Sequence, residues 1–196
     1  MKERPILFSA PMVRAILAGH KSQTRRVVKL PDDILPERTF VDPGNVPIFG
    51  PGPYVKAFHM VEGEELMYPR IRCPYGYPGD RLWVKTGYYK DDYRTPSGRR
   101  YIAGMFMRRD LSPATLEIAE VRVERLQDIS EDDATAEGVK WNPCDCRTSR
   151  GGEGCEGCDD RSAQDVYKAL WESINGPGSW AKNPFVWIVE FRRTKP

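Results

Sequence analysis

The sequence predicts an α+β fold that is mainly β, a small and partly closed β-barrel with two or three short helices packed on its outside. Three observations support this prediction. Six or seven runs with strand character outnumber the segments with helical spacing. The strands do not alternate with helices along the chain, as they would in a parallel βαβ sheet. The 17 prolines and 17 glycines among 196 residues indicate many turns and loops.

Length and charge are typical of a globular protein, and we expect a single domain spanning residues 1–196. Hydrophobic residues make up 40% and charged residues 30%, a balance typical of a folded chain with a core. The net charge of +2 does not by itself indicate a nucleic-acid-binding protein. No apolar run is long enough to cross a membrane, and the first residues lack the apolar core of a secretory signal, so we expect a cytoplasmic location.

The first elements of the chain are predicted to be a strand, a helix and a second strand. Residues 6–8 form a short apolar run with strand character. Ser9 is a candidate helix N-cap, Pro11 suits the first helical turn, and Gly19 is the expected C-terminal stop. Residues 25–28 are expected to form a strand that leaves the loop after this helix.

The middle of the chain is dominated by a long loop excursion at residues 30–70, which is rich in proline and glycine. A strand at residues 54–60 is the main regular element expected within it. Alternating polar and apolar residues indicate a strand at 81–85, and a weaker pattern indicates another at 101–107. A polar loop is expected between them, at residues 91–100.

The C-terminal part contains the strongest patterns. Residues 115–126 alternate almost perfectly between apolar and polar side chains, which predicts a strand with one buried face. Capping signals predict a short acidic helix at residues 130–138 and a second helix at 162–174. An apolar run at residues 185–191 predicts the final strand.

The segment directly after the first helix concentrates the side chains most suited to chemistry. Gly19, Lys21 and Arg26 form the pattern Gly-x-Lys-x-x-x-x-Arg, with a histidine, a threonine and a further arginine between them. Such a cluster suits the binding of a phosphate or another anion, although a basic loop is also a common solvated surface. The candidate substrate- or nucleic-acid-binding residues here are Gly19, His20, Arg25 and Arg26.

At this point the sequence resembles the ASCH domain family of the PUA-like superfamily. The resemblance extends from the loop at 19–26 to the turn and strand at 79–84, the strand-then-helix segment at 121–138 and the last strand at 187–191. It is closest to a group of ASCH-like proteins common in phages and prophages. The resemblance implies a PUA-like β-barrel that handles RNA, modified bases or nucleotides.

One bacterial branch of that family is an amidohydrolase that removes the acetyl group from N4-acetylcytidine. Its catalytic lysine, threonine and glutamate correspond to Lys21, Thr24 and Glu137 in this sequence, the last through the local Ala-Glu-Gly context. The resemblance therefore implies hydrolysis of the amide of an N4-acylated cytidine, with these three residues as the catalytic group.

The implied chemistry is physically reasonable for these residue types. A threonine hydroxyl is a weak nucleophile until a base takes its proton. A lysine can be that base when burial or neighbouring cations lower its pKa, and the two arginines after Thr24 act in that direction. A tight pair between Lys21 and Glu137 has the opposite effect, because it favours the charged lysine.

Four cysteines form a second constellation, in an insertion at about residues 141–160. Cys144, Cys146, Cys155 and Cys158 are two close pairs separated by a glycine-rich stretch. Four thiolates at this spacing are typical of a structural tetrahedral Zn²⁺ site, and we expect no organic cofactor. Two disulfides or free thiols remain alternatives, although a reducing compartment disfavours the disulfides.

Three functions are consistent with these observations. The first is an enzyme that hydrolyses an N4-acylated cytidine in an enclosed pocket. The second is a noncatalytic RNA- or DNA-binding module, for which an open basic groove is expected. The third is a phage-encoded protein that binds a host protein, for which an exposed apolar patch is expected, with residues 30–70 as a candidate location.

Overall fold

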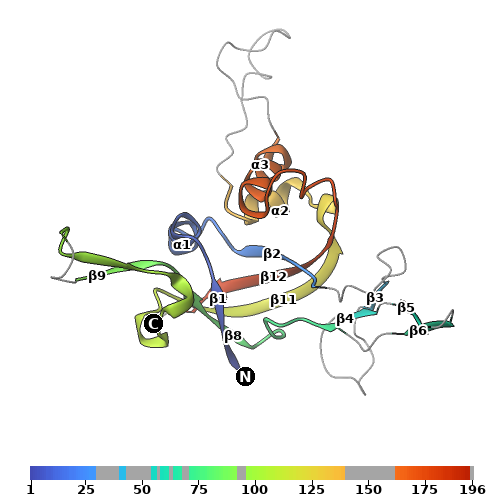
Figure 1. The fold of residues 1–196 in the computed structure, drawn as a ribbon, viewed down its shortest axis with the longest axis horizontal. Helices are drawn as coiled ribbons and strands as arrows, with labels where there is room; N and C mark the ends of the chain where they lie inside the picture. The colour runs from blue at the N-terminus through green and yellow to red at the C-terminus, as the bar shows by residue number, and fades with distance from the viewer. Residues whose placement is uncertain are drawn as a thin grey trace, which may run out of the picture.

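The computed structural model describes residues 1–29, 71–91, 96–139 and 162–194, together with the backbone of four short strands between residues 40 and 67. A five-stranded sheet forms the centre of the molecule, and three helices pack against it (Figure 1). The α+β, mainly β fold class with three short helices is therefore confirmed. In spatial order the sheet contains β1 (Glu3–Leu7), β8 (Arg81–Lys85), β11 (Thr115–Arg125), β12 (Phe185–Arg193) and β2 (Gln23–Val27).

The pairing of these strands makes an open, curved sheet. β1 runs parallel to β8, and the other three neighbouring pairs are antiparallel. Among the described residues β1 and β2 lie at opposite edges and do not pair. The predicted closure into a partial barrel is therefore not seen in this part of the chain. The helix between β1 and β2 carries the chain from one edge of the sheet to the other.

The three helices begin at the residues that the capping signals predict. α1 (Ala10–Leu17) follows Ser9 and has a proline in its first turn. α2 (Glu131–Ala136) begins after Ser130, whose side chain accepts a hydrogen bond from the Asp133 backbone N–H. α3 (Ala163–Asn175) begins with a complete capping box at Ser162. Short 3₁₀ helices lie at Gly104–Phe106, Arg109–Leu111 and Leu126–Asp128.

Side chains on the two faces of the sheet form two hydrophobic clusters. β12 contributes to both, because Trp187 and Val189 face the cluster that includes α1, whereas Val186 and Ile188 face the cluster beneath α2 and α3. A strand buried on both faces is expected to be continuously apolar, as this one is. No helix of the described residues is long and apolar enough to span a membrane.

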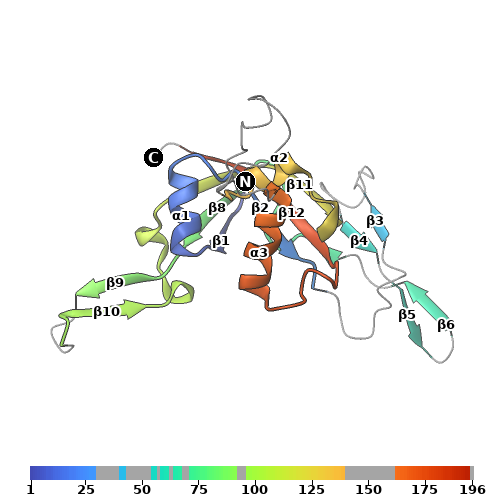
Figure 2. The same ribbon diagram turned by 90° about the horizontal axis from the view of Figure 1, so that it is seen from above.

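A hairpin of β9 (Tyr88–Asp91) and β10 (Arg99–Ile102) projects from the body beside α1 (Figures 1 and 2). We call it the arm. The sequence predicted a loop at 91–100 and a strand at 101–107, and both predictions were wrong in part. The chain leaves the strand after Ile102 and enters a 3₁₀ turn, where Gly104 approaches other backbone so closely that a Cβ would lie 2.8 Å from the Thr86 carbonyl carbon.

The excursion at residues 30–70 contains more strand than expected. β3 (Phe40–Asp42) and β4 (Tyr54–Lys56) form a three-stranded sheet with β7 (Ile71–Arg72), and β5 (Phe58–Val61) pairs with β6 (Glu64–Met67). The strand expected at 54–60 is thus two short strands that belong to different sheets. The cysteine-rich insertion lies outside the described residues.

Candidate functional site

Two turns bring Lys21 and Glu137 together from opposite parts of the chain. After α1 the chain reverses at Gly19, which has a φ of +78°, and it enters β2. Glu137 is the C-cap of α2, and the Ser22 N–H donates to the Ala136 carbonyl at 3.0 Å. Gly138 has a φ of +84°, and a Cβ there would lie 2.9 Å from Lys21 Cβ. Glycine is thus required at this position both for its backbone angle and for the close approach of Lys21.

Lys21 and Glu137 form a buried ion pair. Lys21 Nζ donates to Glu137 Oε2 at 2.7 Å and to the Glu137 backbone carbonyl at 2.8 Å. The two side chains are only 1% and 4% exposed. Burial lowers the pKa of Lys21, and nearby Arg26 and Arg25 act in the same direction, whereas the Glu137 carboxylate opposes this change. The competing effect anticipated from the sequence is therefore present.

Arg25 extends this pair into a charged cluster. Its Nη2 donates to Asp133 Oδ2 at 2.8 Å, and its Nη1 lies 3.7 Å from Glu137 Oε1 without forming a hydrogen bond. Glu137 Oε1 and the Nη1 and Nε atoms of Arg25 are buried with no hydrogen-bond partner. Buried polar atoms are nearly always paired in a folded protein, so unpaired acceptor and donor atoms side by side are typical of a ligand site.

Arg25 and Glu137, which carry these unpaired atoms, line a pocket of about 550 Å³. It lies between the end of β1, the start of α1, strand β2, helix α3 and the base of the arm. α1 contributes to one of the two hydrophobic clusters and α3 to the other. The polar side chains of the pocket are Thr24, Arg25, Arg26 and Glu137, and its aromatic ones are Phe8, Tyr167, Trp171, Tyr89 and Tyr101. A mostly apolar pocket with a few converging polar groups is the usual form of a small-molecule site.

Some of the residues predicted for the site line the pocket, Lys21 lies behind it, and two loop residues lie outside it. Thr24 is 3% exposed and lines the pocket, but among the described residues its hydroxyl makes no hydrogen bond to Lys21 or Glu137. Arg26 also lines the pocket, donates to the Leu7 carbonyl at 2.6 Å and lies over the Phe8 ring at 5.3 Å. Lys21 supports Glu137 from behind and does not line the pocket.

Gly19 and His20 are exposed and lie outside this pocket. The loop pattern therefore contributes to the site through its second half, from Lys21 to Arg26. The first half ends the helix and turns the chain.

Sequence reasoning missed the aromatic wall. Tyr167 and Trp171 lie one helical turn apart on α3, with ring centroids separated by 6.3 Å, and both are buried. Burial raises the pKa of Tyr167, and the Glu137 carboxylate adds to this effect, so its hydroxyl stays protonated and able to donate. The Trp171 Nε1–H is buried without an acceptor. An unpaired indole N–H at a pocket is free to donate to a ligand, and no sequence pattern distinguishes it from that of a core tryptophan.

The four cysteines of the predicted zinc site all lie outside the described residues, so that site stays a prediction. Within the described part of the chain, no group of three or more histidine, cysteine, aspartate or glutamate side chains is arranged to hold a metal ion. Cys73 is a buried free cysteine.

No protein-family model and no curated protein matches the chain. Among solved structures, the crystal structure of an ASCH domain from Lactobacillus crispatus is similar to it, with a TM-score of 0.40 and 13% sequence identity, over 98% of this chain and 79% of that chain. Similarity at this level assigns neither a family nor a function to the chain.

Proposed function

We propose that the pocket binds the base of an N4-acylated cytidine and hydrolyses its amide. The observation that carries this proposal is the state of Glu137, whose Oε2 is fixed by Lys21 while its Oε1 lies unpaired at a pocket that Thr24 also lines. A carboxylate held in this way has a fixed position, and its second oxygen can still accept a hydrogen bond from a ligand.

The pocket suits a flat heterocycle with donors and acceptors on its edge. Phe8, Tyr167 and Trp171 supply apolar surface for the ring faces. Glu137 Oε1 is placed to accept a hydrogen bond from an exocyclic N–H, and the free N–H groups of Arg25 and Trp171 suit a ring nitrogen or carbonyl oxygen. An N4-substituted cytosine presents this combination of one N–H beside ring acceptors.

The proposed reaction uses Thr24 as the nucleophile. Its Oγ1 forms a bond to the acyl carbon, and its proton passes to Glu137. The oxyanion that forms accepts hydrogen bonds from the arginine N–H groups at the pocket, an interaction typically worth about 3 kcal/mol per donor. The C–N bond then breaks as Glu137 returns the proton to N4, which releases cytidine. A water molecule finally hydrolyses the threonine ester and releases the carboxylic acid.

This scheme gives Lys21 a different role from the one implied by the resemblance. Its Nζ donates to two oxygens of Glu137 and lies behind the pocket. Lys21 is therefore a positioning residue for Glu137, and Glu137 is the proton acceptor in contact with the reacting atoms.

The proposal is tested by incubating the protein with N4-acetylcytidine and measuring the release of acetate and cytidine by chromatography. Thr24→Val keeps the shape of the side chain on strand β2 and removes the hydroxyl, so we expect it to abolish turnover. Thr24→Ser keeps a hydroxyl and is the matched control, for which we expect measurable turnover. Equal turnover by the wild type and Thr24→Val would remove Thr24 as the nucleophile.

One observation favours a second candidate, which is binding of the modified base without hydrolysis. The Thr24 hydroxyl makes no hydrogen bond to Glu137 among the described residues, so the nucleophile and its base are not engaged before a ligand arrives. Calorimetric binding of N4-acetylcytidine without release of acetate would support this candidate. Catalytic contacts that form only with substrate bound would instead give turnover.

A further inference from the structure

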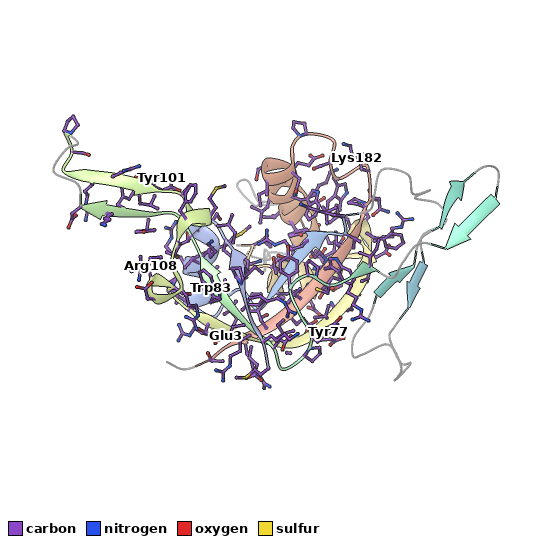
Figure 3. The ribbon with its side chains drawn as sticks, turned by 60° about the horizontal axis from the view of Figure 1, so that its bottom comes forward. Glu3, Tyr77, Trp83, Tyr101, Arg108 and Lys182 are labelled. Atoms are coloured by element: carbon purple, nitrogen blue, oxygen red, sulfur yellow. The ribbon has the colours of Figure 1, made fainter. Side chains whose placement is uncertain are left out.

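The arm carries two exposed tyrosines that continue the aromatic lining of the pocket out into solvent. Tyr89 and Tyr101 are cross-strand partners in the hairpin, with ring centroids 5.4 Å apart in an edge-to-face arrangement. They are 66% and 58% exposed, although both also line the pocket. Figure 3 shows Tyr101 on the arm, which projects from the body of the protein. A closed pocket for a free nucleoside does not need aromatic rings in such a position.

Positive charge is concentrated on the same part of the chain. Residues 85–111 contain seven lysines and arginines and three aspartates, a net charge of +4, whereas the whole chain has only +2. The rest of the protein is therefore slightly acidic. Within the hairpin Lys90 lies directly opposite Arg100 in the strand register. Like charges at opposite positions destabilise a strand pair, and a bound anion removes that cost.

Exposed apolar side chains lie at the base of the arm. Met105 and Phe106 are 64% and 70% exposed, next to the turn that returns the chain to the body. Lys85 donates to the Met105 carbonyl and lies over the Trp83 ring at 5.3 Å. Aromatic and apolar surface interleaved with cations is typical of a surface on which unpaired bases stack while phosphates contact lysine and arginine.

We propose that the arm binds single-stranded RNA, so that the base in the pocket belongs to a nucleotide within a strand and the neighbouring base stacks on Tyr89 and Tyr101. This inference rests on the proposed function: the proposed substrate is a cytidine, which is a ribonucleoside, so a strand that contains it is RNA. The cations of the arm, among them Lys90 and Arg100, contact the phosphates. A duplex is excluded, since its bases are stacked on one another and have no free face to offer the tyrosines.

Fluorescence anisotropy with a labelled oligouridine of about 12 nucleotides, containing one central N4-acetylcytidine, tests this inference. The same variants are measured for binding of free N4-acetylcytidine by calorimetry. Tyr89→Ala combined with Tyr101→Ala is expected to weaken strand binding by at least about tenfold more than nucleoside binding, since stacking contributes about 1–3 kcal/mol per base. Both side chains are largely exposed, and circular dichroism checks that the variant is folded.

A charge variant provides a second, independent measurement. Lys90→Gln combined with Arg100→Gln is expected to lower the slope of log affinity against log salt by about 0.7 per lost phosphate contact. Lys182→Gln is the matched control, because Lys182 is an exposed cation on the loop after α3, far from the arm (Figure 3). We expect it to leave the slope unchanged.

Equal weakening of strand and nucleoside binding by the tyrosine variant would overturn the inference, because the tyrosines would then be only a pocket wall. Equally tight binding of the same oligonucleotide in a duplex would overturn it as well. The proposals of hydrolysis and of strand binding can fail separately. Strand binding that depends on the arm, without release of acetate, would contradict hydrolysis and leave the role of the arm intact.

Discussion

Two charged clusters meet at Asp133, and one of them lines the pocket described above. On one side Asp133 Oδ2 accepts a hydrogen bond from Arg25, which leads to Glu137 and Lys21. On the other side Asp133 Oδ1 accepts from Arg122 Nη2 at 2.9 Å. Arg122 also donates to Glu124 at 2.8 Å and to Glu190. We call these the pocket cluster and the Arg122 cluster.

The difference between the clusters lies in the unpaired atoms that each one buries. The carboxylates around Arg122 raise the pKa of its guanidinium against the opposing effect of burial, and no side-chain atom of Arg122, Glu124 or Glu190 is buried without a partner. The pocket cluster leaves donor and acceptor atoms of Arg25 and Glu137 unpaired. The partly exposed atoms of the Arg122 cluster can also bond to water, whereas the buried and unpaired atoms of the pocket cluster keep binding capacity for a ligand.

The largest expected effect is on turnover. Glu137→Gln should lower the rate of N4-acetylcytidine hydrolysis by about 10²–10⁴-fold, because the proton acceptor of the reaction is removed. Glu190→Gln, which changes the same residue type in the Arg122 cluster, should leave turnover nearly intact. Steady-state assays of both variants measure this. Equal losses would mean that the two clusters do not differ in function.

The next effect is on stability. Lys21→Met should lower the free energy of unfolding by about 3–5 kcal/mol, because it leaves the Glu137 carboxylate buried without its cation. Urea denaturation measures the change.

The double variant Lys21→Met with Glu137→Gln is the control for this prediction. It should recover much of the lost stability, since no unpaired charge remains. Additive losses in the double variant would show that the two side chains are not coupled.

A smaller effect should appear as a pH dependence through Asp133, where the clusters join. Burial raises the pKa of this carboxyl, but hydrogen bonds from Arg25 and Arg122 outweigh it, so the pKa lies below its usual value of 3.8. A lowered folded-state pKa means that this stabilisation is complete above about pH 4 and is lost as pH falls through the folded-state value.

Asp133→Asn should therefore cost about 1.5–3 kcal/mol near neutral pH, as expected for hydrogen bonds to charged groups. The difference from the wild type should shrink as the pH falls below 4. Thermal unfolding of both proteins across pH 2–7 measures this, and a difference that stayed constant would show that the charge of Asp133 is not the cause.

The smallest effect is expected for an ion pair outside both clusters. Arg192 donates to Glu117 at 3.1 Å, but the Arg192 side chain is 74% exposed. Arg192→Gln should change the free energy of unfolding by less than about 1 kcal/mol. Comparing the unfolding free energies of Arg192→Gln and Lys21→Met would show that burial, and not the presence of a salt bridge, decides how much stability is lost. A loss as large as that of Lys21→Met would contradict this conclusion.

Sequence patterns predicted most of the central fold because local signals there agree with tertiary burial. The alternation in β11 and the caps of α2 and α3 appear at the expected residues. Closure of the sheet was not predictable, since it depends on which edges meet in space. The arm was missed because its tyrosines and cations resemble a polar loop until the two strands pair.

The site was predictable in one part only. The motif resemblance pointed to Lys21 and Glu137, which lie far apart in the sequence and prove to be in contact. Trp171 has the spacing of a core residue on a helix, and its free N–H is visible only when neighbouring atoms are known. Lys21 lies behind Glu137 and does not reach the pocket. A sequence pattern does not encode which of two contacting residues faces a pocket.

The position of the cysteine-rich insertion has a consequence for how the protein tolerates change. Residues 140–161 separate α2, whose C-cap is Glu137, from α3, which carries Trp171. The start of α3 is fastened directly to the segment around α2, because Glu131 accepts from the Ala163 N–H at 2.8 Å and the Ile129 carbonyl accepts from Gln164. The closure entropy of a connecting loop grows only slowly with its length. Engineered versions can therefore gain or lose residues at this junction while the two walls of the pocket keep their spacing.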